Sequence, residues 1–203
     1  MESKQTTSLT AHDSTIREPL FEFLEEKYGK IRIIEEKTIG RVRADVVMVT
    51  PDALFGIEIK SDNDTYDRLK KQVKNYNLYY DYNIVAVGST HAMHVADHVP
   101  AWWGIISVEE INGRLDFYVV REPEKNPKVK PERKISILWR PELADIQKKN
   151  NLPAYKGKSK AYVQAVLLDR VPEDIRWKQV SEELFERDYT TIEEEIKNYR
   201  KKH

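Results

Sequence analysis

Two carboxylates and a lysine lie close together in an apolar part of the sequence. Asp45 opens a β-branched-rich run, and Glu58 stands two residues before Lys60 in a second apolar run. Side chains alternate along a strand, so Glu58 and Lys60 share one face while Ile57 and Ile59 point to the other. Charged groups beside a core strand are costly unless they are paired or hold a metal. This layout is typical of a metal-dependent site that cuts phosphodiesters.

A hard divalent cation suits these residue types. Mg²⁺ or Mn²⁺ takes oxygen ligands, and here the ligands would be the carboxylates of Asp45 and Glu58, the backbone carbonyl of Ile59 and phosphate oxygens of a substrate. Lys60 would then position and activate the attacking water. The alternative is an ordinary ion pair between Glu58 and Lys60 on a solvated sheet face, because the spacing E-x-K is common.

The flanking residues predict the elements that position this set. Residues 46–49 and 54–60 are predicted to form a hairpin, since Pro51 and Asp52 break the apolar pattern between them. A helix should follow, capped within residues 62–65 and reaching about Tyr82, because Leu69, Val73, Tyr76 and Tyr80 recur at helical spacing. Gln72 and Tyr76 lie one turn apart on this helix.

Three motifs in this order resemble the PD-(D/E)XK nuclease superfamily. Asp45 matches the aspartate, residues 58–60 the E-x-K, and residues 72–76 the Q-x-x-x-Y of RecB-type members. The segments at residues 16–18, 43–47, 58–65 and 184–190 are similar to a group of small bacterial and phage proteins of that superfamily. The resemblance implies a metal-dependent deoxyribonuclease.

The resemblance also implies a fold, an α/β restriction-endonuclease-like αβββαβ core with a mixed central sheet flanked by helices. The predicted order of elements agrees: a first helix with an apolar face that includes Ile16 and Leu20, strands at 31–34, 46–49 and 54–60, the crossover helix, and a strand at 84–87. Pro19 must begin the first helix or kink it.

Other site residues follow from the resemblance with alternatives. Glu18 is the glutamate that would complete the metal shell, with Glu22 and Glu36 as competitors, and a favourable charge near a helix N-terminus is its other explanation. Gln72 and Tyr76 would orient the site or the phosphate, or else form a partly buried polar pair. Arg43 would hold a phosphate, or neutralise Glu36.

Composition favours a globular enzyme in the cytoplasm. The 203 residues include no cysteine, which excludes disulfides and thiol catalysis, and no apolar run long enough to span a membrane. The 34 basic and 34 acidic residues balance, but residues 121–160 hold 12 Lys or Arg against 5 Asp or Glu. That local excess is expected to attract nucleic acid, or to be a solvated lysine-rich loop.

Further elements are predicted beyond the core. Strands at 102–108, 115–120 and 135–139 should extend the sheet, with a turn at Asn112 and Gly113 between the first two. Three prolines in residues 121–134 favour an extended, exposed arm. Residues 1–140 are expected to form the nuclease-like domain and 141–203 a helical appendage, which either reads the substrate or closes the sheet edge.

The sequence therefore predicts a Mg²⁺- or Mn²⁺-dependent nuclease with DNA as substrate, and leaves RNA open. The alternative is a non-catalytic nucleic-acid-binding or assembly subunit on the same scaffold, acting with a partner in DNA repair or phage defence. No membrane partner is expected. A homodimer, or a separate motor or defence-system protein, is left open as a partner.

Overall fold

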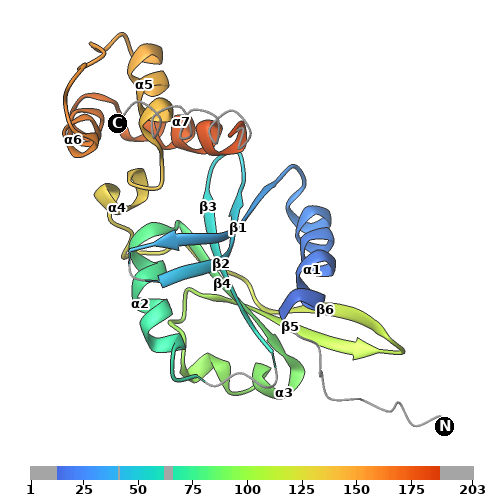
Figure 1. The fold of residues 1–203 in the computed structure, drawn as a ribbon. Helices are drawn as coiled ribbons and strands as arrows, with labels where there is room; N and C mark the ends of the chain where they lie inside the picture. Colours follow the sequence, from blue (N-terminus) through green and yellow to red (C-terminus); the bar gives the residue numbers. More distant parts are fainter. Residues whose placement is uncertain (1–12, 41, 62–65, 188–203) are drawn as a thin grey trace, which may run out of the picture.

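The computed structural model describes residues 13–40, 42–61 and 66–187. Figure 1 labels the elements in chain order. They are α1 (Asp13–Tyr28), β1 (Arg32–Ile39), β2 (Val42–Val49), β3 (Leu54–Lys60), α2 (Leu69–Tyr79), β4 (Tyr82–Gly88), α3 (Ser89–Ala92), the 3-10 helix η1 (Val95–Asp97), β5 (Gly104–Ile111), β6 (Arg114–Arg121), α4 (Pro131–Ile135), α5 (Arg140–Lys149), α6 (Lys160–Arg170) and α7 (Glu173–Phe185).

One mixed sheet organises the chain. Its six strands lie in the order β1-β2-β3-β4-β5-β6. β1, β2 and β3 form an antiparallel meander, β3, β4 and β5 run parallel, and β6 returns antiparallel to β5. The helix α2 makes the crossover between the parallel neighbours β3 and β4. The first six elements thus follow the predicted order of helix, three strands, helix and strand.

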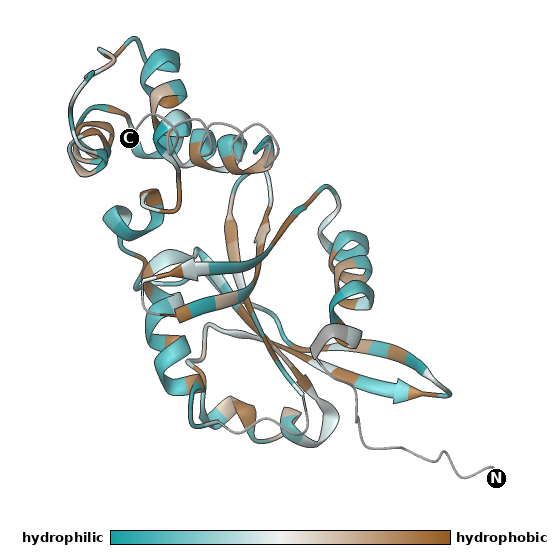
Figure 2. Cartoon of the chain, in the orientation of Figure 1, coloured by the Kyte–Doolittle hydropathy of each residue, from teal (hydrophilic) through white to brown (hydrophobic). Residues whose placement is uncertain are grey.

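The two faces of the sheet carry different apolar layers. α1 covers one face, where Ile16, Leu20 and Leu24 pack with alternate residues of the strands, among them Met48 and Ile57. α2 and the C-terminal helices cover the other face. Figure 1 shows α1 and α2 on opposite sides of the sheet, and Figure 2 shows the hydrophobic residues concentrated in the strands between them. Residues of β3 that alternate therefore face different helices.

α2 packs unusually close to the sheet at one glycine. A Cβ added to Gly56 in β3 would lie 2.2 Å from Cδ2 of Tyr80 and 2.7 Å from Cδ1 of Tyr76. Only a residue without a side chain leaves room for both rings. Gly56 thus lets Tyr76 of α2 and Tyr80, the residue after the helix, reach the strand that carries Glu58 and Lys60.

Several helix boundaries differ from the predicted ones. α1 contains Pro19 in its interior, so the helix begins six residues before the proline. α2 begins at Leu69, Arg68 provides no side-chain cap, and the helix ends at Tyr79 because Tyr80 is extended. The predicted capping residues 62–65 lie outside the described residues.

The strand predicted at residues 135–139 is wrong. Pro131 starts the short helix α4, which ends at Ile135, and Ile137 and Leu138 are buried in the turn after it. The apolar spacing that resembled a strand instead supplies contacts between the sheet and the C-terminal helices. The strands predicted at 102–108 and 115–120 correspond to β5 and β6, and Asn112 and Gly113 form the predicted turn with φ of 53° and 76°.

The proline-rich segment is extended but held against the core. Asn126 is buried, and its side-chain amide donates to the carbonyls of Asn77 and Tyr80 at 2.9 Å and 2.7 Å. The backbone N–H of Lys130 donates to the carbonyl of Leu78 at 3.0 Å. Asn126 is therefore buried, unlike the predicted exposed arm, because α2 and the residue after it provide partners for its amide, whereas Lys130 and most of residues 122–133 are exposed.

The described part of the predicted helical region contains α5, α6 and α7, which share a core with the sheet, and residues 188–203 lie outside the described residues. Leu143, Leu167 and Leu184 belong to the same buried cluster as Val47 and Val85. Figure 1 shows α4 to α7 gathered at one end of the molecule. Across the described part of the chain, no helix is both long enough and apolar enough to cross a membrane.

Candidate functional site

The candidate site lies where β2 and β3 separate. The pairing of these strands runs from Val49 with Leu54 to Val46 with Ile57, and Asp45 and Glu58 come directly after the last pair. Oδ2 of Asp45 accepts a hydrogen bond of 2.9 Å from the backbone N–H of Ile59. A side chain thus replaces the ladder hydrogen bond at the fork. The fork brings the two predicted carboxylates to one place.

Glu58 is the most enclosed residue of the site. Its side chain has no solvent exposure, and Lys60 Nζ donates to its Oε1 at 2.6 Å. The side-chain amide of Gln72 donates to the same oxygen, and the hydroxyl of Tyr76 donates to Oε2 at 2.8 Å. Lys60 is 8% exposed, so the pair is not the solvated surface ion pair of the alternative explanation.

Tyr76 ties α2 to the fork. Besides its bond to Glu58, the hydroxyl accepts from the backbone N–H of Asp45 at 3.2 Å and lies 3.4 Å from the carbonyl of Ile57. The side chain is fully buried. The tyrosine therefore fixes the separation of β2 from β3 at the point where both carboxylates emerge.

The charged form of Glu58 is disfavoured by its surroundings. Burial, and then the nearby charge of Asp45, raise the pKa of Glu58 to about 7, against the opposing effects of Lys60 and the hydrogen bond from Tyr76. Burial also raises the pKa of Tyr76 well above its usual value, with the charges of Glu58 and Asp45 adding to the effect. A cation bound here would relieve the repulsion between the two carboxylates.

The donor set fits a hard divalent cation. Asp45, Glu58 and the carbonyl of Ile59 offer oxygen, which Mg²⁺ and Mn²⁺ prefer. A carboxylate has about four acceptor positions. Three donors from the described residues occupy three of these positions on Glu58. Oε1 of Gln72 is buried beside Glu58 and has no hydrogen-bond partner among the described residues. The site therefore keeps acceptor capacity for a cation and its bound water.

The predicted third carboxylate does not join the first two. Glu18 is exposed on α1, which covers the face of the sheet opposite α2 and Glu58. Within residues 13–40, 42–61 and 66–187, no three His, Cys, Asp or Glu side chains form a group that could hold a metal. A complete shell of protein carboxylates is thus not assembled, and the role of Glu18 stays a prediction.

Arg43 and Glu36 pair with each other beside the fork. Nη1 of Arg43 lies 3.1 Å from Oε2 of Glu36, and Arg17 from α1 lies 3.7 Å from the other oxygen. Glu36 has a φ of 50°, and the pairing of β1 with β2 is interrupted where Glu36 faces Asp45. The structure therefore shows Arg43 neutralising Glu36, and within the described part of the chain neither residue forms a hydrogen bond or ion pair with Glu58.

Sequence patterns missed the backbone part of this site. The N–H groups of Asp45 and Ile59 both bond to site side chains, and no residue type signals that role. These N–H groups are available to the site only because β2 and β3 separate beyond their last pair, Val46 with Ile57.

Comparison with known proteins identifies the family. The bacteriophage P4 protein cII family matches residues 6–202. The chain belongs to this family. A phage family agrees with the predicted bacterial or phage character of the protein. No curated protein matches the chain.

One solved structure shows a distant likeness to this member of the family. It is SfsA of Pyrococcus furiosus in complex with Ca²⁺, with a TM-score of 0.35 and 12% sequence identity. The match covers 58% of this chain, and the chain spans 65% of the length of SfsA. A likeness of this size says nothing further about the site.

Proposed function

We propose that this protein is a metal-dependent nuclease of the PD-(D/E)XK type that hydrolyses DNA phosphodiester bonds. The observation that carries the proposal is the convergence of Asp45, Glu58 and Lys60 at the fork with Gln72 and Tyr76 from α2. Residues up to 31 positions apart along the chain, Asp45 and Tyr76, meet there in one hydrogen-bond network. A purely structural ion pair needs neither the second carboxylate nor the amide.

Each side chain has a stated role in this proposal. Asp45 and Glu58 hold a Mg²⁺ or Mn²⁺ ion together with the carbonyl of Ile59. Such an ion supplies neutralisation of the charge that develops on phosphorus oxygens and lowers the pKa of bound water. Lys60, held at 2.6 Å from Glu58, orients the attacking water for in-line displacement. Gln72 and Tyr76 keep the Glu58 carboxylate in one orientation.

Cleavage assays with matched variants test the proposal. Supercoiled, linear, single-stranded and branched DNA, and RNA, are incubated with wild-type, Asp45→Asn, Lys60→Ala and Lys148→Ala protein in Mg²⁺, Mn²⁺ or chelator. Asp45→Asn and Lys60→Ala should lower the cleavage rate about 100-fold or more, as loss of a group that acts on the reacting atoms does. Lys148→Ala, an exposed lysine on α5, should cut like the wild type.

Two outcomes would contradict parts of this proposal. Undiminished cutting by Lys60→Ala would remove Lys60 from the chemistry. Cutting of RNA alone, lost in Asp45→Asn, would keep the nuclease and replace DNA as its substrate.

Among the described residues the carboxylate shell has no third member, which favours one second candidate, a nucleic-acid-binding subunit without turnover. Such a protein would bind DNA equally well in chelator. It would also give no calorimetric Mg²⁺ signal that Asp45→Asn removes. A nuclease should give that signal and lose it in the variant, so one titration separates the two candidates.

A further inference from the structure

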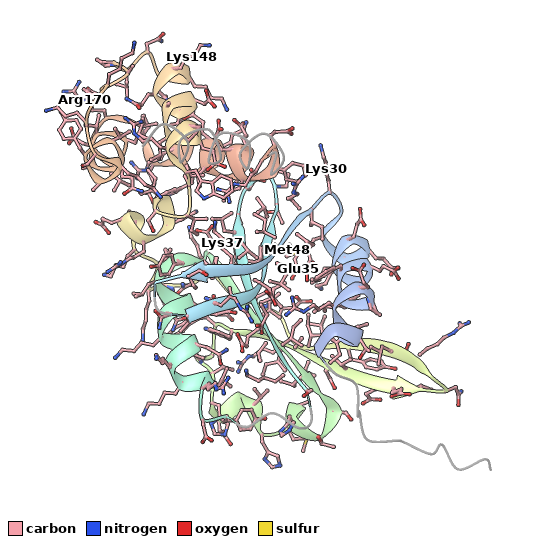
Figure 3. The ribbon with its side chains drawn as sticks, in the orientation of Figure 1. Lys30, Glu35, Lys37, Met48, Lys148 and Arg170 are labelled. Carbon is pink, nitrogen blue, oxygen red and sulfur yellow. The ribbon has the colours of Figure 1, made fainter. Side chains whose placement is uncertain are left out.

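A cavity of about 250 Å³ lies between the β1–β2 end of the sheet and the C-terminal helices. Its walls include Lys37 and Gly40 from the end of the meander, Tyr79 from α2, and Trp139 and Lys160 from the helical region. Figure 3 shows Lys37 directed into the space between β1 and the helices. Three separate parts of the chain therefore build this cavity.

Cations dominate the surroundings of the cavity. Lys37 and Lys160 line it, and the guanidinium of Arg187 lies 4.1 Å from the ring centre of Trp139, which is also a wall. Glu142 is the carboxylate that interacts with all three cations, and it is bound to Arg187 at 2.5 Å. Three positive charges thus face one carboxylate, that of Glu142, which already forms an ion pair with Arg187.

The two lysines have no carboxylate of their own. Nζ of Lys37 makes no ion pair or hydrogen bond with the described residues and lies 5.2 Å from the ring centre of Trp139. Nζ of Lys160 donates to the carbonyl of Ser136 at 2.9 Å and forms no ion pair within the described chain. Each ammonium has three donors, so most of their donors can reach a ligand.

Keeping these lysines charged is unfavourable in the protein alone. Burial, together with the charges of Arg187 and Lys160, lowers the pKa of Lys37 to about 8, with Glu142 opposing them. Burial also lowers the pKa of Lys160. An anion in the cavity would reverse this cost, because opposite charge favours the ammonium form.

Size and wall chemistry define the anion. The volume is below the roughly 300–1,000 Å³ of pockets for drug-sized ligands. Lys37 and Arg187 already lie over the Trp139 ring, so this ring is not open for stacking with an aromatic ligand. A small tetrahedral oxyanion fits both facts. We infer that this cavity binds a phosphate group through the ammonium groups of Lys37 and Lys160.

This site shares no lining residue with the nearby carboxylate fork. Its wall residue Tyr79 follows Tyr76 by three residues on α2, about 4.5 Å along the helix axis. The inference does not need the fork to be catalytic. The phosphate can belong to a nucleic-acid backbone or to a small molecule, and the same lysines would bind it in both cases.

Binding is tested on the full chain with three single variants. Titration calorimetry with inorganic phosphate and pyrophosphate, supported by tryptophan fluorescence, compares the wild type with Lys37→Met, Lys160→Met and Lys148→Met. The wild type should bind, and each cavity variant should bind about tenfold or more weakly, as expected for loss of one charge-assisted hydrogen bond. Lys148→Met removes the same charge from an exposed position of α5, labelled in Figure 3, and should bind like the wild type.

Thermal unfolding separates a binding role from a structural one. Because neither lysine forms an ion pair with a carboxylate of the described residues, Lys37→Met and Lys160→Met should keep or raise the melting temperature while they weaken binding. The inference is overturned if the wild type binds neither probe, or if all three variants bind alike. A fall in melting temperature that accounts for the whole loss of binding would also overturn it.

Competition identifies the source of the phosphate. If a short DNA duplex displaces inorganic phosphate, and Lys37→Met weakens duplex binding, the phosphate belongs to a nucleic acid. If the duplex leaves phosphate binding unchanged, the ligand is a small phosphate-containing molecule. Phosphate binding that persists in Asp45→Asn protein without any nuclease activity in the wild type would support this site and reject the proposed function.

Discussion

Tyr76 and Tyr80 show how much a single hydroxyl decides. Both are fully buried, Tyr76 on α2 and Tyr80 directly after it, and their ring centres lie 5.5 Å apart. The hydroxyl of Tyr76 bonds to Asp45 and Glu58, whereas the hydroxyl of Tyr80 has no hydrogen-bond partner among the described residues. The same atom is therefore part of the candidate site in one residue and a buried polar group without compensation in the other.

Exchange of each tyrosine for phenylalanine should separate these roles. Tyr76→Phe leaves the Asp45 N–H and one Glu58 oxygen without their partner, so the free energy of unfolding should fall by about 1–3 kcal/mol. Tyr80→Phe, the matched control, should change it by less than about 0.5 kcal/mol or raise it. Urea unfolding measures both. Equal losses in the two variants would show that packing, not the hydroxyl network, explains the effect.

Lys37 predicts a dependence of stability on pH. Its pKa falls from 10.5 to about 8 in the folded protein, where it faces Arg187, Glu142 and Lys160. Between pH 8 and 10.5 the unfolded chain holds the proton and the folded chain releases it, so this lysine adds stability as the pH rises. Below pH 8 the full cost of its charge is present.

Lys37→Met isolates this contribution from that of other titrating groups. The variant should be more stable than the wild type near pH 7, on the order of 1–2 kcal/mol for this partly exposed group. The difference should shrink as the pH approaches 10. Chemical unfolding at pH 7, 8.5 and 10 measures the difference, and a gap independent of pH would contradict the lowered pKa of Lys37.

At the scale of elements, a buried lysine joins α4 to the turn between α2 and β4. Nζ of Lys134 lies 2.7 Å from both carboxylate oxygens of Asp81, and Oδ2 of Asp81 also accepts from the backbone N–H of Leu54. Lys134 is 2% exposed and lies 4.4 Å from the ring centre of Trp177 in α7. One residue thus connects the sheet, α2 and the C-terminal helices.

Removal of this lysine should be costly. Lys134→Met leaves the Asp81 carboxylate with its backbone donor alone, and the free energy of unfolding should fall by about 3 kcal/mol. The double variant Asp81→Asn with Lys134→Met should recover part of the loss, since no unpaired charge remains. Lys149→Met, a half-exposed lysine paired with Glu182 and Glu183, should cost less than about 1 kcal/mol. A double variant less stable than Lys134→Met would contradict the role of the pair.

At the scale of the whole molecule, the sheet and the helical region share one core. Ile34 and Val87 of the sheet belong to the same buried cluster as Leu143, Leu167 and Leu184 of the helices. Arg32 in β1 also donates to the carbonyl of Arg187 at 2.8 Å. The division into residues 1–140 and 141–203 therefore describes the order of elements along the chain, not two separate cores.

A shared core predicts a single unfolding transition. Scanning calorimetry should give one peak, with equal calorimetric and van't Hoff enthalpies, and residues 1–139 alone should fail to form a stable fold. Two resolved transitions, or a stable fragment of residues 1–139, would show instead that the helical region is an independent unit.

Sequence patterns were informative wherever chemistry is local. The alternation in β3 fixed the common face of Glu58 and Lys60, the Asn112–Gly113 pair fixed the hairpin between β5 and β6, and the helical spacing of Gln72 and Tyr76 placed them on one side of α2. These features depend on residues a few positions apart, where backbone geometry alone decides which side chains meet. Glu58 and Lys60 share a face for this local reason, whereas Asp45 comes close to them only through the pairing of β2 with β3.

Only the tertiary structure decided what lies between distant segments. Residues 135–138 have the apolar pattern of a strand. They instead form the end of a helix and a turn, buried under the C-terminal helices. Glu18 lies on the far side of the sheet because its helix buries the opposite apolar layer. The cavity with Lys37 and Lys160 belongs to no motif, since 123 positions separate these lysines. Over such separations, the number of intervening residues does not predict the distance between two side chains in space. The packing of the two apolar layers determines that distance instead.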